Sequence, residues 1–202
     1  VGQDTLRQME PNMTREAIAA LYDPNIAIVD PVRLTIALIE NAGQNGVQVM
    51  RETEVLNIFQ KMNQFEVETN RGSIKCRFIV NAAGTSVDKI ARLVNSDDFV
   101  LYPIRGYVGI LDKNLGDLIK HEIHMRPDAP GQMNILTPSV HGNLFFGTTM
   151  QPAQRGDYST TRRIAQIGLQ NVRKIVPDLS EKEVINSFAG FLMFRNWEVG
   201  WH

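Results

Sequence analysis

The chain has 202 residues, of which 43% are hydrophobic and 21% are charged, enough apolar sequence for one large or two small folded domains. Its 21 basic residues nearly balance its 22 acidic ones, so the formal net charge of -1 excludes a chain-wide positive field that would recruit nucleic acid or anionic membrane. The single cysteine, Cys76, excludes an internal disulfide and a thiolate-based metal centre, and a cytoplasmic location is therefore expected.

The first 45 residues predict two helices with a short strand between them. Thr14 is a candidate cap for a helix that ends at Leu21, and residues 26–29 are expected to form a brief strand. Asp30 followed by Pro31 predicts a helix start, because the carboxylate accepts hydrogen bonds from unpaired amides and proline needs no donor there. This helix carries one apolar face and is expected to be half-buried and to end at a glycine: Leu34, Ala37, Leu38, Ala42 and Gly43.

Three strand-like runs then predict a small antiparallel meander, with polar turn residues between them: 54–59, 65–69 and 73–76. The continuous apolar run at residues 78–80 is typical of a strand that is covered on both faces. Small residues follow at Ala82, Ala83 and Gly84, where another group can approach the backbone closely. Ser86 is expected to cap the next helix.

The second half reads as a mostly antiparallel sheet with one covering helix. The helix is expected at residues 160–175, and His141-Gly142-Asn143 is a typical hairpin turn. Five segments are predicted to be strands: 101–111, 122–125, 133–136, 144–148 and 184–188. The predicted fold class is therefore α+β.

Four segments, in this order, resemble the D-amino-acid oxidase superfamily of flavoproteins. They are Val29-Asp30-Pro31 with its helix, residues 79–84, Pro103-Ile104-Arg105-Gly106-Tyr107, and residues 137–143 continuing to Gly147-Thr148-Thr149. The sequence around His141-Gly142-Asn143 and at residues 187–190 is most similar to bacterial glycerol-3-phosphate dehydrogenases. L-2-hydroxyglutarate oxidases and other 2-hydroxy-acid or amino-acid oxidases are the alternatives within the superfamily.

The resemblance implies two incomplete domains. Residues 1–98 would be the remnant of an α/β FAD-binding domain without its phosphate-binding βαβ unit, and residues 99–202 a substrate-binding domain that is incomplete at its C-terminus. The family's Gly-x-Gly-x-x-Gly fingerprint and its C-terminal glycine-rich segment are not found in the sequence. We therefore expect an internal fragment of a longer protein, inactive by itself, whose uncovered apolar surface promotes self-association. Peripheral membrane attachment is an alternative to a purely cytoplasmic protein.

The resemblance also implies the activity and the cofactor. The parent protein is expected to oxidise a small 2-hydroxy compound, with glycerol 3-phosphate as the leading candidate, by hydride transfer to FAD. A non-catalytic binding domain that borrowed the fold is the alternative. The residues expected beside the cofactor are Val55, Ala82, Ala83, Gly84 and Gly147.

Four residues are candidates for contact with an anionic substrate. Arg105 comes first because a guanidinium fork suits a carboxylate or phosphate, although a surface position at a strand end or a salt bridge between domains would also explain it. The family normally has an arginine soon after the last Ala-Gly pair, where this chain has Leu192, so Arg195 could act from a shifted position. His141 could be a base or a plain turn residue, and Tyr107 could reach the substrate or simply pack.

No metal site is expected from the histidines. His121 and His124 are three residues apart, a spacing that brings ligands together on a helix. The sequence around them reads as a loop leading into a strand, and it offers no third ligand.

Overall fold

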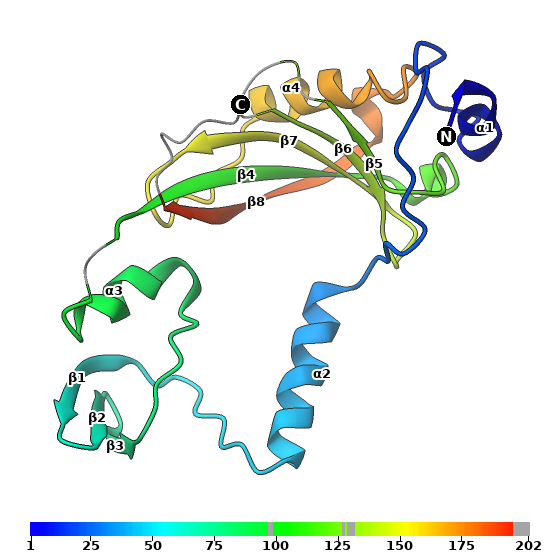
Figure 1. Ribbon diagram of the computed structural model, residues 1–202. Helices are drawn as coiled ribbons and strands as arrows, with labels where there is room; N and C mark the ends of the chain where they lie inside the picture. The colour runs from blue at the N-terminus through cyan, green and yellow to red at the C-terminus, as the bar shows by residue number, and fades with distance from the viewer. Residues whose placement is uncertain (97–98, 127, 129–131, 196–202) are drawn as a thin grey trace. The chain divides into compact units, whose positions relative to one another are not determined.

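The computed structural model describes residues 1–96, 99–126, 128 and 132–195, which form two compact units (Figure 1). Among the described residues, unit 1 combines Val1–Leu34 with Ile104–Phe191, and unit 2 comprises Thr35–Pro103 together with residues 192–195. Unit 2 is thus inserted in the sequence of unit 1. This division differs from the expected boundary between residues 98 and 99, because the N-terminal segment packs with the second half of the chain.

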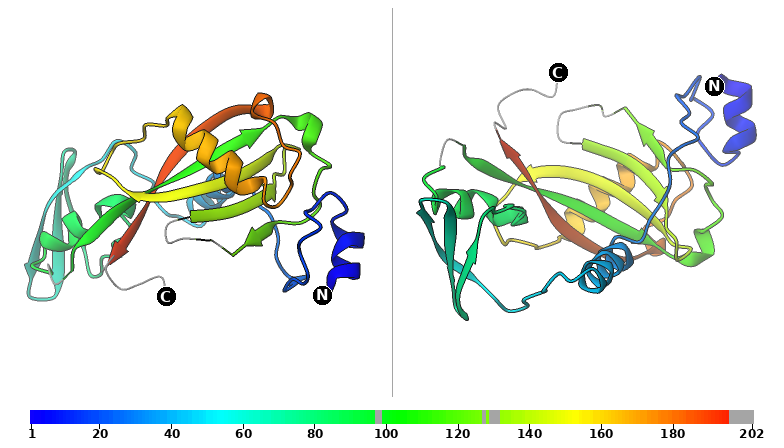
Figure 2. Two further views of the ribbon diagram at one scale, coloured as in Figure 1. Left: turned by 90° about the horizontal axis from the view of Figure 1, so that it is seen from above. Right: turned by 60° about the horizontal axis from the view of Figure 1, so that its bottom comes forward.

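The larger sheet has five strands in the order β5-β6-β7-β4-β8, and the pairs β4–β7, β5–β6 and β6–β7 are antiparallel. The strands are β4 (Leu101–Leu111), β5 (Ile123–Met125), β6 (Gln132–Pro138), β7 (Leu144–Pro152) and β8 (Val184–Arg195). Helix α4 (Arg162–Val172) lies across one face of this sheet (Figure 2). The predicted antiparallel sheet with a covering helix is confirmed.

The core of unit 1 lies between α4 and the sheet. Helix α4 begins at Thr161, whose hydroxyl accepts a hydrogen bond from the amide of Ile164 at 3.3 Å. Each large apolar side chain buried beneath it contributes about 1.5–3 kcal/mol relative to an exposed position. The buried cluster contains, among others, Leu111, Leu136, Leu144, Phe146, Leu169, Val172, Ile175 and Val176.

The N-terminal segment begins with helix α1 (Gln3–Met9), and the expected helix from Thr14 to Leu21 is wrong. The backbone amide of Thr14 donates instead to the carbonyl of Ile175 at 2.7 Å, which ties the segment to the end of α4. The expected strand at residues 26–29 is also absent, and these residues form no regular structure. Contacts with distant parts of unit 1 therefore outweigh the local sequence signals.

Glu10 is the strongest attachment of this segment to the sheet unit. Its side chain is only 3% exposed. The amide of Lys120 donates to both carboxylate oxygens at 3.0 and 3.1 Å, and the amide of His121 donates to Oε1 at 2.8 Å. Nδ1 of His121 lies 2.7 Å from the same oxygen. These donors replace the water that the buried carboxylate loses.

Helix α2 (Pro31–Gln44) begins at the predicted cap. Oδ1 of Asp30 accepts hydrogen bonds from the amides of Val32 and Arg33 at 2.9 and 3.0 Å. The helix passes Gly43 by one residue, and the chain turns at Gly46, whose φ is +86°. None of the residues of α2 is buried, so its expected half-buried face is left uncovered in the described part of the chain.

Unit 2 contains the predicted meander, with β1 (Val55–Lys61), β2 (Gln64–Thr69) and β3 (Gly72–Cys76) paired in antiparallel order. The 3₁₀ turn η1 (Gly84–Ser86) leads into α3 (Val87–Arg92). Ser86 precedes this helix as expected, but its side chain makes no capping hydrogen bond. Two further 3₁₀ turns, η2 (Lys113–Leu115) and η3 (Glu181–Glu183), lie in unit 1.

The apolar run at residues 78–80 is not the buried strand that its sequence predicts. The run has no strand assignment, and Phe78 and Val80 are 81% and 91% exposed. A strand covered on both faces needs neighbouring strands and helices. In the residues that the structure describes, no strand pairs with this run. The sequence carries the signal for burial, and the described chain holds nothing that buries it.

Candidate functional site

The loop Ala82–Gly84 in unit 2 presents accessible main chain. Asn81 holds it in place, since its Nδ2 donates to the carbonyl of Val87 at 2.8 Å and its Oδ1 accepts from the amide of Ala83 at 3.3 Å. Gly84 has a φ of +53°, in the left-handed region that favours glycine. A Cβ at Gly84 would meet no atom within 4 Å, so the space beside this backbone is open. The loop fits a group that approaches the main chain closely, as predicted for FAD.

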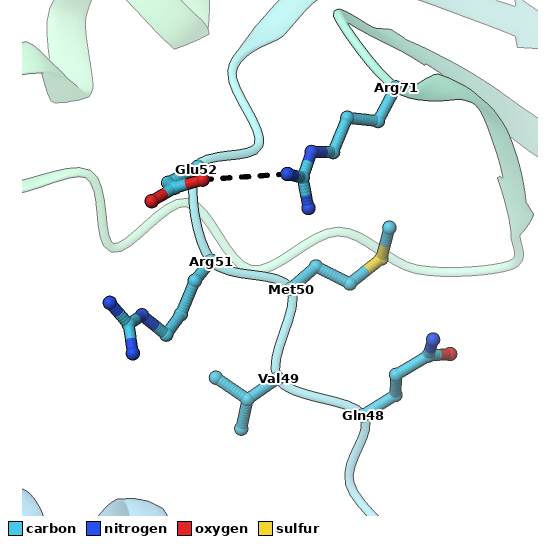
Figure 3. Close-up of a pocket in the computed structure, with 6 residues that line it drawn as sticks. All are labelled: Gln48, Val49, Met50, Arg51, Glu52 and Arg71. Atoms are coloured by element: carbon cyan, nitrogen blue, oxygen red, sulfur yellow. Dashed lines mark hydrogen bonds and ion pairs between the residues drawn. The ribbon is translucent and has the colours of Figure 1, made fainter.

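Val55, the other cofactor candidate in unit 2, begins β1 opposite Thr69 and is partly buried. Just before it, an open hollow of about 540 Å³ is lined by Gln48, Val49, Met50, Arg51, Glu52 and Arg71 (Figure 3). Nη2 of Arg71 lies 3.4 Å from Oε2 of Glu52. Sequence reasoning missed this hollow, because it depends on how the segment before β1 folds against the β2–β3 turn.

The backbone of Glu52 is unusual at this hollow. Its φ is +53°, and its carbonyl accepts a hydrogen bond from Nδ2 of Asn70 at 3.2 Å. Oδ1 of the same asparagine accepts from the amide of Glu54 at 2.9 Å. Asn70 therefore fixes a left-handed residue that costs about 1–3 kcal/mol in isolation.

Gly147, the cofactor candidate in unit 1, lies on the sheet face opposite α4. Its neighbour Phe146 is fully buried beneath the helix, and successive strand residues point to opposite faces. Gly147 pairs with Ile135 on one side and with Val108 on the other. Gly147 thus adds no side chain to this face of the sheet between Val108 and Ile135.

The charge of Arg105 is already paired within unit 1. Its Nη1 donates to Oδ2 of Asp157 at 2.7 Å, to Oγ of Ser159 at 2.8 Å and to the Asp157 carbonyl at 3.3 Å. Hydrogen bonds from the Ser159 hydroxyl and amide, with a smaller effect of Arg105, lower the pKa of Asp157 below its usual value. The ion pair joins two residues of unit 1 and is therefore not a salt bridge between domains, and the substrate contact stays a prediction.

The imidazole of His141 contacts the carboxylate of Asp30, the residue that caps α2. Its Nε2 lies 2.9 Å from Oδ2 of Asp30, a residue 111 positions earlier in the chain. The amide of Arg33 and then His141 hold the pKa of Asp30 below its usual 3.8. Gly142, with a φ of +84°, makes the predicted hairpin turn. The position of His141 favours the turn interpretation, in which it joins the hairpin to the start of α2.

We expect Asp30→Asn to reduce the dependence of stability on acid. A carboxylate with a lowered pKa stabilises the fold above its unfolded pKa near 3.8, and this stabilisation is lost as the pH falls through the lower folded value. Asparagine caps helices as well as aspartate does, so the change removes mainly the charge. Melting temperatures of the two proteins should differ at about pH 7 and approach each other as the pH falls below the unfolded pKa near 3.8. Asp178→Asn, at an exposed carboxylate, should have the same melting temperature as the unmodified chain throughout this pH range.

Tyr107 lies in the core beneath α4 rather than at an open surface. The register of β4 shifts between Gly106 and Val108, and Tyr107 at this irregularity is 4% exposed. Burial raises the pKa of its phenol, an effect that the nearby Ser187 partly opposes. Its Oη nevertheless has no hydrogen-bond partner of ordinary geometry among the described residues. This position favours the packing interpretation over a substrate contact.

Arg195 is the last residue of β8, and its guanidinium lies 5.6 Å from the ring centroid of Phe99. Leu192, which stands where the family normally has an arginine, is 48% exposed on the same strand. The structure therefore places Arg195 three residues beyond that position. Its contact with substrate stays a prediction.

The remaining described histidines also pair with carboxylates. His121 contacts Glu10, and Nε2 of His124 contacts Oε1 of Glu122. Burial raises the pKa of Glu122, but the hydrogen bonds from His124 and Thr137 outweigh it and lower the pKa overall. Within the described residues, no three histidine, cysteine or acidic side chains are grouped so as to hold a metal ion. None of the helices in that part of the chain has the length and apolar character needed to cross a bilayer.

Comparison with known proteins adds independent evidence. Residues 1–197 match the family described as FAD dependent oxidoreductase. The chain is 32% identical over 191 residues to a glycerol 3-phosphate dehydrogenase from Caloramator mitchellensis, covering 94% of this chain and 40% of the dehydrogenase.

Two solved structures have the same fold over nearly the whole chain. L-alpha-glycerophosphate oxidase from Mycoplasma pneumoniae, solved with FAD bound, superposes with a TM-score of 0.82 at 26% identity, covering 98% of this chain and 53% of the oxidase. Glycine oxidase from Bacillus cereus gives the same TM-score and identity, covering 97% of this chain and 53% of that enzyme. The chain thus spans about half the length of the relatives it matches.

Proposed function

Because the chain belongs to the FAD dependent oxidoreductase family, we propose that its protein oxidises a small 2-hydroxy compound with FAD as hydride acceptor, and that glycerol 3-phosphate is the leading substrate. The observation that carries the proposal is the open loop Ala82–Gly84, whose left-handed glycine leaves room beside the backbone. The similarity to the glycerol 3-phosphate dehydrogenase supports the choice of substrate. L-2-hydroxyglutarate and amino acids are the alternative substrates, the latter supported by the similarity to glycine oxidase.

Cofactor binding and substrate binding are assigned to different parts of the chain. We propose that residues 1–98 contribute to an FAD-binding domain and residues 99–202 to a substrate-binding domain. Ala82, Ala83 and Gly84 would hold the cofactor through their main chain. Val55 and the hollow before it would receive the adenine, since an arginine side chain can stack on an aromatic plane. Gly147 would leave space for the flavin on its face of the sheet.

We expect the chain to bind FAD, and Gly84→Val to weaken that binding at least tenfold. The valine side chain would occupy the space beside the loop that the cofactor needs, and a branched residue is strained at a φ of +53°. A tenfold loss corresponds to about 1.4 kcal/mol. The measurement is a titration with FAD followed by flavin fluorescence and by the visible absorbance spectrum.

The control for backbone strain is Gly46→Val. Gly46 also has a positive φ, +86°, and open space around its Cβ position, but it lies outside the predicted cofactor site. It should bind FAD as the unmodified chain does. Equal loss of binding in both variants would assign the effect to strain, and an absence of FAD binding in the unmodified chain would contradict a usable cofactor wall in these residues.

A non-catalytic binding domain is the second candidate function. Leu192 at the family's arginine position favours it, because an exposed leucine offers no charge to an anionic substrate. The internal pairing of Arg105 with Asp157 points the same way. Oxidation of glycerol 3-phosphate by the FAD-loaded full-length protein would exclude this candidate.

The uncovered apolar residues support partners of a particular kind. Besides Phe78 and Val80, several apolar side chains of α2 and of the segment after it are strongly exposed: Val32, Leu34, Ile36, Leu38, Ile39, Val47, Val49 and Met50. Contiguous exposed apolar surface usually marks an interface. We propose that further parts of the same polypeptide cover it, and that copies of the chain associate where those parts are missing.

A further inference from the structure

The guanidinium of Arg105 is held at one end and open at the other. All three hydrogen bonds of this side chain fall on Nη1. Nε and Nη2, which together form the edge that binds oxyanions in a bidentate manner, have no hydrogen-bond acceptor among the described residues. The side chain as a whole is 14% exposed, and neither nitrogen is among the buried polar atoms that lack a partner. This donor edge is therefore within reach of a ligand, and an oxyanion can accept from both nitrogens at once.

The segment that holds Nη1 is itself well ordered. We call residues 153–160, between β7 and α4, the strap. Gly156 has a φ of +91°, the amide of Asp157 donates to the carbonyl of Gln154 at 3.0 Å, and the amide of Ser159 donates to Oδ1 of Asp157 at 3.0 Å. Tyr158 packs edge-on against Phe191 of β8, with ring centroids 5.0 Å apart. The strap therefore fixes Asp157 and Ser159 against Arg105 from one side.

We propose that the Nε and Nη2 edge of Arg105 binds an oxyanion, the phosphate or carboxylate group of a small ligand, and that Asp157 and Ser159 are the positioning residues of this site. The identity of the ligand as a substrate rests on the proposed function, whereas anion binding itself does not. Asp157 also sets the affinity, because its negative charge neutralises Arg105 and repels a second anion. The empty site is thus neutral and stable, and it binds an anion less tightly than a lone arginine fork would.

The test is a calorimetric titration of the chain with inorganic phosphate and, separately, with lactate. Arg105→Gln should abolish binding, and Arg105→Lys should weaken it about tenfold, because lysine keeps the charge but loses the fork. Asp157→Asn keeps the shape and removes the competing charge, so it should tighten binding about tenfold. The double variant R105Q/D157N should not bind, because the gain acts only through Arg105.

The matched control is Arg162→Gln, which removes an exposed arginine paired with Glu181 in the same unit. Its anion binding should equal that of the unmodified chain. Binding that survives Arg105→Lys and Arg105→Gln unchanged, or that does not respond to Asp157→Asn, would overturn the proposal, and so would the absence of binding by both anions. Phosphate binding without lactate binding supports a phosphate ester as ligand, and the reverse supports a 2-hydroxy acid.

The outcome is separable from the proposed function. A chain that binds phosphate through Arg105 but does not bind FAD would support the anion site and contradict the cofactor proposal. A chain that binds FAD but neither anion would support the cofactor proposal and contradict the anion site. Circular dichroism of each variant shows whether the fold is retained, and Asp157→Asn, which gains affinity, gives a result that unfolding cannot imitate.

Discussion

Replacing Glu10 by alanine should lower the free energy of unfolding by about 3 kcal/mol. The carboxylate is 3% exposed and satisfies the amides of Lys120 and His121 as well as the His121 ring. Without it, these part-buried donors would lose the acceptor that they share. The effect is larger than that of an ordinary surface ion pair, which contributes up to about 1 kcal/mol.

The measurement is urea unfolding followed by circular dichroism, with Glu16→Ala as the control. Glu16 lies on the same N-terminal segment, but its side chain is exposed. Its removal should change stability by less than about 0.5 kcal/mol. The loss of unfolding free energy in Glu10→Gln should lie between the losses in the two alanine variants, because the amide retains an acceptor oxygen but loses the charge. Equal midpoints for the two alanine variants would show that the segment does not depend on Glu10.

Gly109→Ala should destabilise unit 1 by about 3 kcal/mol. A Cβ at Gly109 would lie under 3.0 Å from three carbons of the Phe146 ring, closer than real Cβ contacts allow. Phe146 is completely buried between the sheet and α4, so the ring has no free space into which it could move. The methyl group would therefore separate β4 from β7 or force the phenyl ring out of its rotamer.

The neighbouring glycine provides the control for Gly109. A Cβ at Gly106, three residues earlier on β4, would meet no atom within 4 Å, and Gly106→Ala should have little effect. In the Gly109→Ala background, Phe146→Leu should recover part of the lost stability, since it removes the atoms in conflict. Thermal unfolding of the unmodified chain, of Gly109→Ala, of Phe146→Leu and of the double variant tests this coupling. A double variant that is less stable than the sum of the single changes predicts would argue against the steric explanation.

Sequence patterns predicted the elements that depend on local signals. The cap at Asp30, the meander and the hairpin turn at Gly142 all have a residue-level cause that acts over a few positions. The helix expected from Thr14 and the strand at residues 26–29 failed, because this segment is positioned by contacts with residues more than 100 positions away. The buried strand expected at residues 78–80 was also wrong for the described chain, because Phe78 and Val80 are exposed and no described strand pairs with this run.

The candidate site was predictable by residue type more than by geometry. Arg105 is a plausible ligand for an anion from its chemistry alone, but only the structure shows that Asp157 and Ser159 occupy one end of its guanidinium. The sequence left open whether Tyr107 packs or reaches the substrate, because its burial beneath α4 accompanies a register shift in β4, and alternation in a sequence does not reveal a β-bulge. His141 could not be matched to Asp30 without knowing which loops meet.

The attachment of the N-terminal segment imposes an order on biosynthesis. Glu10 and Asp30 leave the ribosome long before their partners, since His121 and His141 are each 111 residues later. At about 5–20 residues per second, the nascent segment waits roughly 5–20 s before either contact can form. Residues 35–103, which belong to unit 2, are made during this interval, so the meander and α3 can fold before the first 34 residues meet their partners in unit 1. The carboxylate of Glu10, which is buried in the folded chain, therefore remains without its hydrogen-bond donors throughout this interval.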